Sequence, residues 1–392
     1  MPPASDVSPH LRPETVRGHD GFFRVVRRLD GAWTWLDPAG NECFACAVGG
    51  FEPTEGAPEL LRDCGMNVVV AAPERAPSGM ACMAVVDFVG AARPIHAPGV
   101  RLPDVFDPAW PALAHRRAEE ACAPWAEQRE VLGWLADDAL DWGAATEPGR
   151  PSLLQVCLSL EPGFAAYHAA WEFVLALHAG RLADLGKAWG LPLSHREAIR
   201  ECTRNDQALA SRGYLRDQAR WLGEMAQRYF LSTATAIRAH APRHLLLGAR
   251  ERRAGVGVEA MAPVRTAGAF PLVDVPWIPW REIGPATSGP VFAGDFTWVA
   301  RDFLDSSRGA ASLTSVERML RRGRASLRRL VTHPAVVGYA WECWRDRPGE
   351  RPPFARGLVH VDGGEAREHT ELVADMNRRV ATLRGTASFN AS

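Results

Sequence analysis

The 392-residue sequence is poor in lysine and lacks a long apolar run. Lys187 is the only lysine among 45 basic residues, so Schiff-base chemistry has a single candidate. A Schiff-base lysine needs a desolvated pocket, whereas Lys187 lies in a segment predicted to be an exposed loop. Together with the abundance of alanine, glycine and proline, the bias towards arginine is typical of a GC-rich bacterial genome.

Signals for export and for membrane insertion are also missing. The N-terminal segment has neither the basic start nor the apolar centre of a secretory signal, and no window approaches the length of a membrane span. The eight cysteines are scattered, as in proteins of a reducing cytoplasm. A net charge of −1 gives no general attraction for nucleic acid, and the basic helix predicted at 315–332 is expected to be a solvated outer helix. We therefore expect a cytoplasmic protein that binds neither membranes nor nucleic acid.

Motifs for cofactors and metals are absent as well. The sequence has no glycine-rich nucleotide motif, no H-x-x-x-H pair and no G-x-S-x-G serine, so we expect no cofactor and no metal. Cys43 and Cys46 form a C-x-x-C within an apolar, strand-like run. Because successive side chains of a strand alternate between its faces, we predict buried thiols here and not a shared metal site.

Short apolar runs alternate with helical segments along most of the chain. Eight such runs lie between Phe44 and Ala340, which predicts an α/β fold consisting of a single (β/α)8 TIM barrel. A mostly helical stretch from 142 to 240 predicts a helical insertion after strand four. Residues 1–20 are expected to form a flexible N-terminal arm, and residues 21–392 the barrel. The expected strands are 42–48, 67–71, 81–86, 131–136, 244–248, 272–275, 291–294 and 336–340.

The stretch 131–142 has the composition of an active-site rim. Its apolar run ends in two adjacent carboxylates, Asp137 and Asp138, and Asp141 and Trp142 follow. In a barrel of parallel strands, the chemistry gathers where the strands end. The other strand ends carry an arginine, two further acids and several tryptophans, which is typical of a sugar-type site, because indoles stack on pyranose rings while charged groups hold hydroxyls. Trp298 and Trp341 have an alternative interpretation, as packing residues between strands and helices.

This pattern assigns roles to ten residues and predicts a small-molecule or sugar-like ligand. The predicted catalytic residues are Asp138, Asp295 and Glu342. The predicted substrate-binding residues are Asp137, Trp142, Arg250, Trp280, Trp298, Trp341 and Trp344.

Several segments resemble signature segments of β-agarase-like glycoside hydrolases. The resemblance is carried by 30–40, 104–108 and 133–142, with further matches at 244–250, 294–298, 338–346 and 357–359. It runs in order from about residue 20 to 383. It implies a retaining (β/α)8 enzyme that carries its acid/base on strand four and its nucleophile on strand seven.

The sequence departs from the motifs of this family at the catalytic positions. The strand-four motif of the family resembles Gly-Tyr-Phe-x-Asp-Asn-Glu-Leu, in which the glutamate is the acid/base. Here Asp138 stands at the asparagine position and Ala139 at the glutamate position, while Asp295 replaces the nucleophilic glutamate. Alanine cannot transfer a proton, and loss of a general acid/base costs about 10² to 10⁴ in rate. A shorter nucleophile also withdraws its carboxylate by about 1.5 Å.

Three interpretations follow from these departures. In the first, the barrel is an enzyme with a reassigned active site. Asp138 and Asp295 would carry out acid/base chemistry (dehydration, cyclisation or rearrangement) on a small polyhydroxylated or glycosylated metabolite, in specialised-metabolite biosynthesis. In the second, the protein is a catalytically inactive pseudo-glycosidase that binds a carbohydrate-like ligand. In the third, it is a glycosidase with a non-standard carboxylate pair. The sequence favours an enzyme over a pure binding protein.

Overall fold

The computed structural model describes residues 9–138, 140–144, 151–202, 211–250, 261–298, 316–349 and 355–385. Its centre is an eight-stranded sheet in which every described neighbour pair is parallel, with the order β12-β10-β7-β6-β5-β15-β14-β13. The strands are β5 (Ala45–Gly49), β6 (Val68–Val70), β7 (Ala81–Val86), β10 (Val131–Ala136), β12 (Leu245–Leu246), β13 (Trp277–Pro279), β14 (Val291–Phe296) and β15 (Val336–Trp341).

The sheet curls so that its two edge strands approach each other. The amide of Trp277, in β13, donates to the carbonyl of Leu247, directly after β12, at 2.8 Å. The amide of Val275 donates to Leu246 at 3.1 Å. The curled parallel sheet fits a TIM-like barrel, so the predicted α/β class is confirmed.

The sixth strand differs from its prediction. Residues 272–275 were expected to form it, but the strand is β13, Trp277–Pro279. The physical reason lies in Asp274, whose side chain accepts a hydrogen bond from the amide of Leu246 at 2.9 Å while its own amide donates to the carbonyl of Leu246. The segment is thereby fixed against β12 before the ladder with β14 begins.

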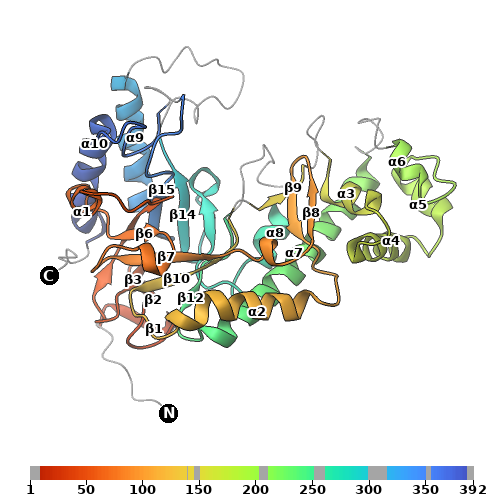
Figure 1. Cartoon of the computed structure of the whole chain (residues 1–392), viewed down its shortest axis with the longest axis horizontal. Coiled ribbons are helices and arrows are strands. Elements are labelled where there is room, and N and C mark those ends of the chain that lie inside the picture. Colours follow the sequence, from red (N-terminus) through yellow and green to blue (C-terminus); the bar gives the residue numbers. More distant parts are fainter. Residues whose placement is uncertain are drawn as a thin grey trace.

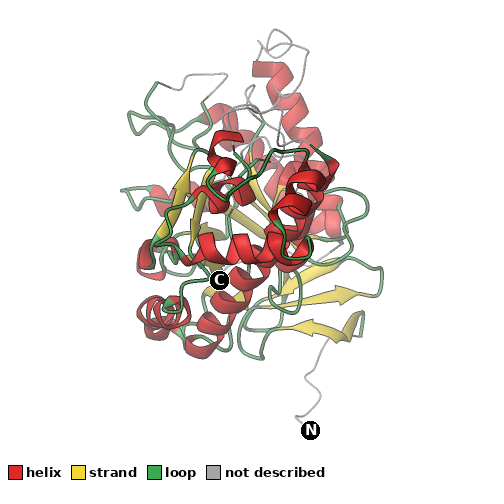
Figure 2. Ribbon diagram, turned by 90° about the vertical axis from the view of Figure 1, so that its right-hand side faces the viewer, coloured by secondary structure: helices red, strands yellow, loops and turns green. Residues whose placement is uncertain are grey.

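A second, antiparallel sheet closes one end of the parallel sheet. It contains β1 (Leu11–Arg17), β2 (Arg24–Arg28), β3 (Trp33–Leu36) and β4 (Glu42–Cys43), and Figure 2 shows it beside the end marked N. The amide of Trp33 donates to Pro334, and its indole donates to Ser288. Because these acceptors precede β15 and β14, this sheet lies at the amino ends of the strands. Residues 11–17 are therefore a paired strand and not part of a loose arm; residues 1–8 lie outside the described part.

The remaining elements are mostly helical. Beside the barrel, a lobe contains β8, β9, β11 and α3 to α6, and it extends to the right of Figure 1. Its three strands form a sheet with the order β11-β9-β8. The lobe elements are β8 (Pro94–Ala97), β9 (Val100–Pro103), β11 (Asp141–Trp142), α3 (Leu153–Ser159), α4 (Ala165–Leu177), α5 (Leu182–Trp189) and α6 (Ala198–Cys202). The other helices are α1 (Ala57–Asp63), α2 (Trp110–Cys122), α7 (Arg212–His240), α8 (Ala262–Ala267), α9 (Val316–Thr332), α10 (Arg367–Arg378) and α11 (Val380–Arg384).

Two further predictions concern the core and the membrane. Cys43 and Cys46 are both buried free thiols, as predicted, and they belong to different apolar clusters. Burial raises the pKa of the Cys46 thiol to about 12, so it stays protonated. Among the helices in the described residues, none combines the length and the apolar character needed to cross a lipid bilayer.

Candidate functional site

An arginine links two of the three predicted catalytic carboxylates. Asp138 follows β10, Asp295 lies near the end of β14, and Arg250 follows β12. Arg250 Nη1 donates to Asp138 Oδ2 at 3.2 Å, and Arg250 Nη2 donates to Asp295 Oδ1 at 2.9 Å. The structure thus brings together three residues from three separate strand ends, as the barrel prediction expected.

Arg250 is held in place by its backbone and by an aromatic ring. Its amide donates to the carbonyl of Asp137 at 3.2 Å, and its carbonyl accepts from the amide of Leu140 at 3.0 Å. Its guanidinium lies 5.2 Å from the ring centroid of Trp277. Burial acts to lower the pKa of Arg250, but the attraction of Asp295 and then of Asp138 outweighs burial, so the pKa is raised. The site therefore keeps a permanent positive charge between two carboxylates.

Two of the acidic residues occupy an uncommon backbone conformation. Asp137 has φ 67° and Asp295 has φ 53°, and Ala179 is the third non-glycine residue with positive φ among the described residues. Such conformations are sparsely populated for residues other than glycine and cluster at functional sites. At Asp295 the pairing of β14 with β15 also shifts in register, between Ala293 and Phe296. Both strand ends thus turn sharply where they present a carboxylate.

Gly294 explains how Asp295 can approach the arginine. A Cβ at Gly294 would lie 1.8 Å from the indole nitrogen of Trp277, far inside any real contact. Trp277 is the same ring over which Arg250 lies. Only glycine at position 294 lets the ring lie against the strand, so Gly294 contributes indirectly to the position of Arg250.

Glu342, the third predicted catalytic residue, has its own arginine. Its carboxylate pairs with the guanidinium of Arg356, which is fully buried, whereas Glu342 is partly exposed. The amide of Glu342 donates to the carbonyl of Phe296 at 3.0 Å, which places it beside the end of β14. Glu342 also acts electrostatically on Arg250, so the two ion-pair groups belong to one charged cluster.

Sequence reasoning missed two arginines of this cluster. Arg356 follows a segment outside the described residues, and nothing in its sequence neighbourhood suggested a buried cation. Arg101, in β9, donates to the carbonyl of Asp138 at 3.0 Å and lies 4.0 Å from Asp87. The only signal in the sequence for these two arginines was the number of acids predicted at the strand ends, because buried carboxylates require compensating cations.

Asp137 does not face the cluster with its side chain. It is fully buried, its Oδ1 accepts from the amide of Val89 at 2.9 Å, and the Tyr229 hydroxyl lies 2.7 Å from its Oδ2. The same hydroxyl lies 2.8 Å from the carbonyl of Ala136. Burial is the main reason why the pKa of Asp137 is raised to about 7. Because the Asp137 carboxyl is fully buried, it is not accessible for the predicted substrate binding.

The predicted tryptophans lie in the core and do not form an open wall. All five have 3% or less of their surface exposed. The indole of Trp298 donates to His369, and the indole of Trp341 donates to the carbonyl of Arg356. For these two residues the packing interpretation describes the structure, because no ring face is accessible. The other three pack against neighbouring rings: Trp142 on Tyr229 and Phe230, Trp280 on Phe296, and Trp344 on Phe51.

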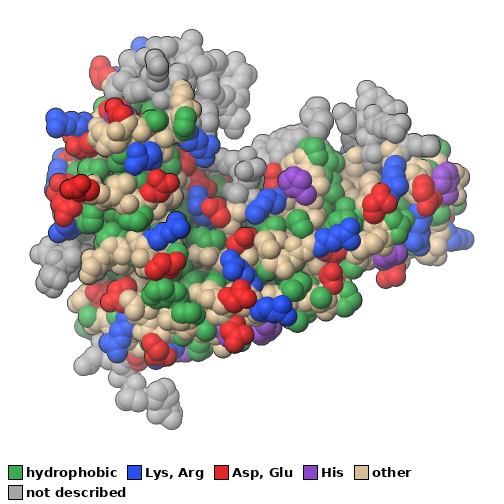
Figure 3. All heavy atoms as spheres, in the orientation of Figure 1, with side chains coloured by type: hydrophobic (Ala, Val, Ile, Leu, Met, Phe, Trp, Pro, Cys, Tyr) green, Lys and Arg blue, Asp and Glu red, His purple; other side chains and the backbone are tan. Residues whose placement is uncertain are grey.

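The surface is hollowed between the barrel and the lobe. Figure 3 shows acidic and basic side chains together in this hollow. Asp138 lies shortly before β11 of the lobe, and its side chain is 51% exposed, whereas those of Arg250 and Asp295 are 16% and 15% exposed. Asp138 is therefore the most accessible member of the linked trio. A separate surface hollow of about 350 Å³ against α2, lined in part by Arg116, Arg117 and Glu120, contains none of the predicted site residues.

Comparisons with known proteins point to one group of enzymes. No model of a protein family matches the sequence. The beta-agarase A of Vibrio sp. (strain JT0107) is 25% identical over 265 residues, which are 63% of this chain and 26% of that protein. The chain thus spans about a quarter of the length of this curated relative.

Solved structures give the same result for the fold. An exo-beta-agarase superposes with a TM-score of 0.71 at 16% identity, covering 95% of this chain and 67% of the other. A second agarase superposes with a TM-score of 0.67 at 16% identity, covering 94% and 66%. The chain has an agarase-like glycoside hydrolase fold.

Proposed function

We propose that the protein is a glycosidase-like barrel enzyme with a reassigned active site, which acts on a carbohydrate or another small polyhydroxylated or glycosylated molecule. The observation that carries this proposal is the cluster of Asp138, Arg250 and Asp295 at the carboxyl ends of three strands in an agarase-like fold. In α/β barrels, these strand ends are where catalytic residues gather. A hydroxyl-rich ligand suits this mixture of carboxylate acceptors and guanidinium donors.

The ion pairs suggest different chemical roles for Asp138 and Asp295. A guanidinium within hydrogen-bonding distance favours the charged form of a carboxylate. Asp295, the less exposed of the two, is a fixed negative charge suited to stabilising positive charge that develops on a sugar-like ring. Asp138 is accessible, and it would first accept a proton from the substrate and then return the proton to the departing hydroxyl. Dehydration or rearrangement by one proton-carrying residue needs no separate acid.

A binding role without turnover is the second candidate. It is favoured by the single guanidinium that compensates both carboxylates, and by the alanine at position 139, where the strand-four motif that the sequence resembles has a glutamate. A third candidate is a glycosidase that uses the pair directly. Retaining hydrolysis requires carboxyl groups about 5 to 5.5 Å apart, and inverting hydrolysis about 6.5 to 9.5 Å. The separation measured in a ligand complex would distinguish the two mechanisms.

Ligand screening followed by product analysis tests these candidates. A thermal-shift screen of sugars, polyols and glycosylated small molecules would identify ligands, and mass spectrometry would then search for products. We expect Asp138→Asn to lower turnover by about 10² to 10⁴ while ligand binding persists. Asp184→Asn is the control, because Asp184 lies in α5 at the surface of the lobe, where it pairs with Arg181. Its turnover should remain close to that of the wild type.

Each other outcome supports a different candidate. Ligands that bind tightly but are never converted, in wild type and Asp138→Asn alike, would establish the binding role. Release of nitrophenol from simple nitrophenyl glycosides at ordinary glycosidase rates would show that the site is not reassigned. A cytoplasmic location, a role in specialised-metabolite biosynthesis, and the status of α3 to α6 as an insertion after strand four stay predictions.

A further inference from the structure

The side chain of Asp137 lies where the ends of three barrel strands meet. Its amide donates to the carbonyl of Val86 at the end of β7, and its own carbonyl accepts from the amide of Arg250 after β12. Asp137 itself follows β10 directly, with the left-handed φ of 67°. A change at this residue is therefore transmitted through the backbone to Arg250 on one side and to Asp138 on the other.

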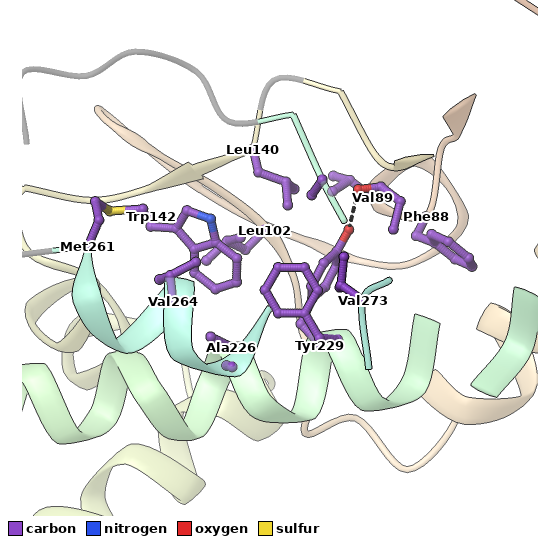
Figure 4. Packing of buried hydrophobic residues seen from close by; sticks show 14 of the residues in the cluster. Phe88, Val89, Leu102, Leu140, Trp142, Ala226, Tyr229, Met261, Val264 and Val273 are labelled. Atoms are coloured by element: carbon purple, nitrogen blue, oxygen red, sulfur yellow. Dashed lines mark hydrogen bonds between the residues drawn. The ribbon is translucent and has the colours of Figure 1, made fainter. Parts of the chain in front are cut away.

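Counting protons around Tyr229 favours one charge state of this carboxyl group. The Tyr229 oxygen lies 2.8 Å from the carbonyl oxygen of Ala136 and 2.7 Å from Asp137 Oδ2. Figure 4 shows Tyr229 rising from α7 towards the segment of Val89, with its hydrogen bond dashed. A tyrosine has one hydroxyl proton, and a carbonyl oxygen can only accept. Both short contacts are satisfied in full when Tyr229 donates to Ala136 and a proton on Asp137 donates to Tyr229.

Burial favours a neutral Asp137 carboxyl group, and its effect on the pKa outweighs the hydrogen bonds from Val89 and Tyr229, which favour the charged form. Asp87, at the end of β7, adds a negative charge nearby, and Arg101 of β9 acts on Tyr229. The guanidinium of Arg250 is engaged by Asp138 and Asp295, and no ion pair to Asp137 is found in the described residues. Burial raises the pKa of Asp137 and also that of Tyr229, so the tyrosine does not ionise in its place.

We propose that Asp137 is a positioning residue that carries a proton in weakly acidic solution, and that loss of this proton near neutral pH loosens the junction holding Arg250 and Asp138. An ionised Asp137 would draw the Tyr229 proton away from the carbonyl of Ala136, and it would place an uncompensated charge in a fully buried position. The strand end must then shift to admit water or a cation. This inference goes beyond the proposed reaction and does not depend on which substrate is bound.

Infrared difference spectroscopy tests the first half of the proposal. The C=O stretching band of a protonated carboxylic acid should be present in the wild type at about pH 5.5, absent from Asp137→Asn, and lost from the wild type as the pH rises through about 7. The asparagine of this variant mimics the neutral acid, because its amide can donate to Tyr229 while its oxygen accepts from Val89. Identical bands in wild type and Asp137→Asn would overturn the proposed protonation.

Two further variants make the assignment specific. Asp104→Asn is the matched control: Asp104 is buried and its pKa is raised by burial, but it accepts hydrogen bonds from Phe106 and Ala166, away from this junction. It should leave the Asp137 band unchanged. If Asp137→Asn does not fold, Tyr229→Phe serves instead. The hydroxyl of Tyr229 can donate to an ionised Asp137 and so lowers its pKa; without this donor the acid should stay protonated to higher pH, and an unaltered titration would contradict the proposal.

Crystal structures at two pH values test the second half. In the wild type, the 3.2 Å contact between Arg250 and Asp138 should be kept at about pH 5.5 and lengthened at about pH 8.5. In Asp137→Asn it should be kept at both. An arginine position that is unchanged at alkaline pH in the wild type would show that the proton on Asp137 does not control the junction.

Discussion

At the scale of single residues, the acids of this site differ in how their charge is compensated. Asp138 and Asp295 share one guanidinium, and Glu342 pairs with the buried Arg356. Asp137 has a tyrosine and a backbone amide instead of a cation. Because compensation by a cation favours the charged form and burial favours the neutral form, the acids at these strand ends are prepared for different tasks.

The raised pKa of Asp137 predicts how folding stability changes with pH. Its folded value of about 7 lies above the ordinary value of 3.8, so the folded state binds the proton more tightly than the unfolded chain does. Its contribution is therefore fully present below pH 3.8 and is lost as the pH rises towards 7. A pKa difference of about three units sets an upper limit of roughly 4 kcal/mol on this contribution to folding stability.

Urea denaturation at a series of pH values measures this effect. The stability of Asp137→Asn relative to the wild type should increase from about pH 4 to about pH 7 and then level off, because asparagine cannot ionise. Asp184→Asn, at an exposed ion pair with Arg181, is the control, and its stability difference from the wild type should stay small at every pH. A stability difference between Asp137→Asn and wild type that stays constant with pH would contradict the assignment.

The sequence predicts the linked trio but not its environment. Asp138, Arg250 and Asp295 follow apolar runs, and the rule that parallel strands end on one face brings them together. Arg101 and Tyr229 come from a hairpin and a long helix, whose positions depend on tertiary packing that periodicity does not encode. The tryptophans at the strand ends were harder to place for a similar reason, because the sequence does not show whether a ring after a strand points inwards or outwards.

At the scale of elements, α7 connects the lobe to the barrel. Its Tyr229 reaches the end of β10, and its Asp217, nearer the start of the helix, faces the lobe. Asp217 is fully buried, and its Oδ2 accepts hydrogen bonds from His178 at 2.6 Å and from the indole of Trp189 at 2.9 Å. These partners belong to the end of α4 and to α5. One helix thus fixes both the lobe and the strand end that carries Asp138.

Removal of the Asp217 carboxylate should loosen α4 and α5 on α7. In Asp217→Ala, the buried indole of Trp189 and the half-buried ring of His178 lose their acceptor, and breaking a buried charged network of this kind costs roughly 3 to 5 kcal/mol. Hydrogen–deuterium exchange of residues 165–189 should therefore rise strongly, while exchange of β10 changes little. Burial alone would raise the pKa of Asp217, but the hydrogen bonds from His178 and Trp189 outweigh burial and lower the pKa. The stabilisation of the fold by this carboxylate is therefore present above the ordinary pKa of an aspartate and is lost as the pH falls through the lowered pKa.

Asp184→Ala is the control for this experiment. Asp184 lies on α5 as well, but it pairs with Arg181 at the surface, where such a pair contributes about 0 to 1 kcal/mol. Its exchange pattern should match the wild type. Equal effects of the two substitutions would mean that Asp217 does not hold the lobe.

Elements were predictable where their pattern is strong and local. Parallel strands buried on both faces have continuous apolar runs, so β7, β10 and β15 lie where the sequence placed them. β1 was missed, because its mostly polar residues carry no strand pattern and it is stabilised by pairing with β2. β8 and β9 were missed because they form a short hairpin whose order depends on pairing with β11.

At the scale of the whole molecule, the two ends of the barrel have different compositions. Val25, Trp33 and Trp35 of the antiparallel sheet share an apolar cluster with side chains of the parallel strands, and Phe23, from the turn between β1 and β2, belongs to it as well. The opposite end carries the charged cluster of Asp138, Arg250 and Asp295. Packing of the closed end therefore supports stability, and under the proposed function the ligand binds at the opposite end.

Truncation of Trp35 tests the closed end. Trp35 is fully buried, and Trp→Ala substitutions of this kind cost roughly 3 to 5 kcal/mol, because a large cavity remains. Urea denaturation of Trp35→Ala should show this loss, with ligand binding retained in the folded fraction. Leu29→Ala, at a residue that is 59% exposed just after β2, should change stability by less than about 0.5 kcal/mol. A loss of under about 1 kcal/mol for Trp35→Ala would show that the sheet is not an integral part of the core.

The position of the antiparallel sheet has a practical consequence for measuring ligands. Leu11, near the start of the described chain, belongs to this sheet, and Arg384, near its end, donates to the carbonyl of Trp33 in the same sheet. Both attachment points therefore face away from the charged cluster. A single attachment point engineered on this sheet, for example at the exposed Leu29, would tether the protein to a sensor chip with the charged cluster turned towards the flowing sample.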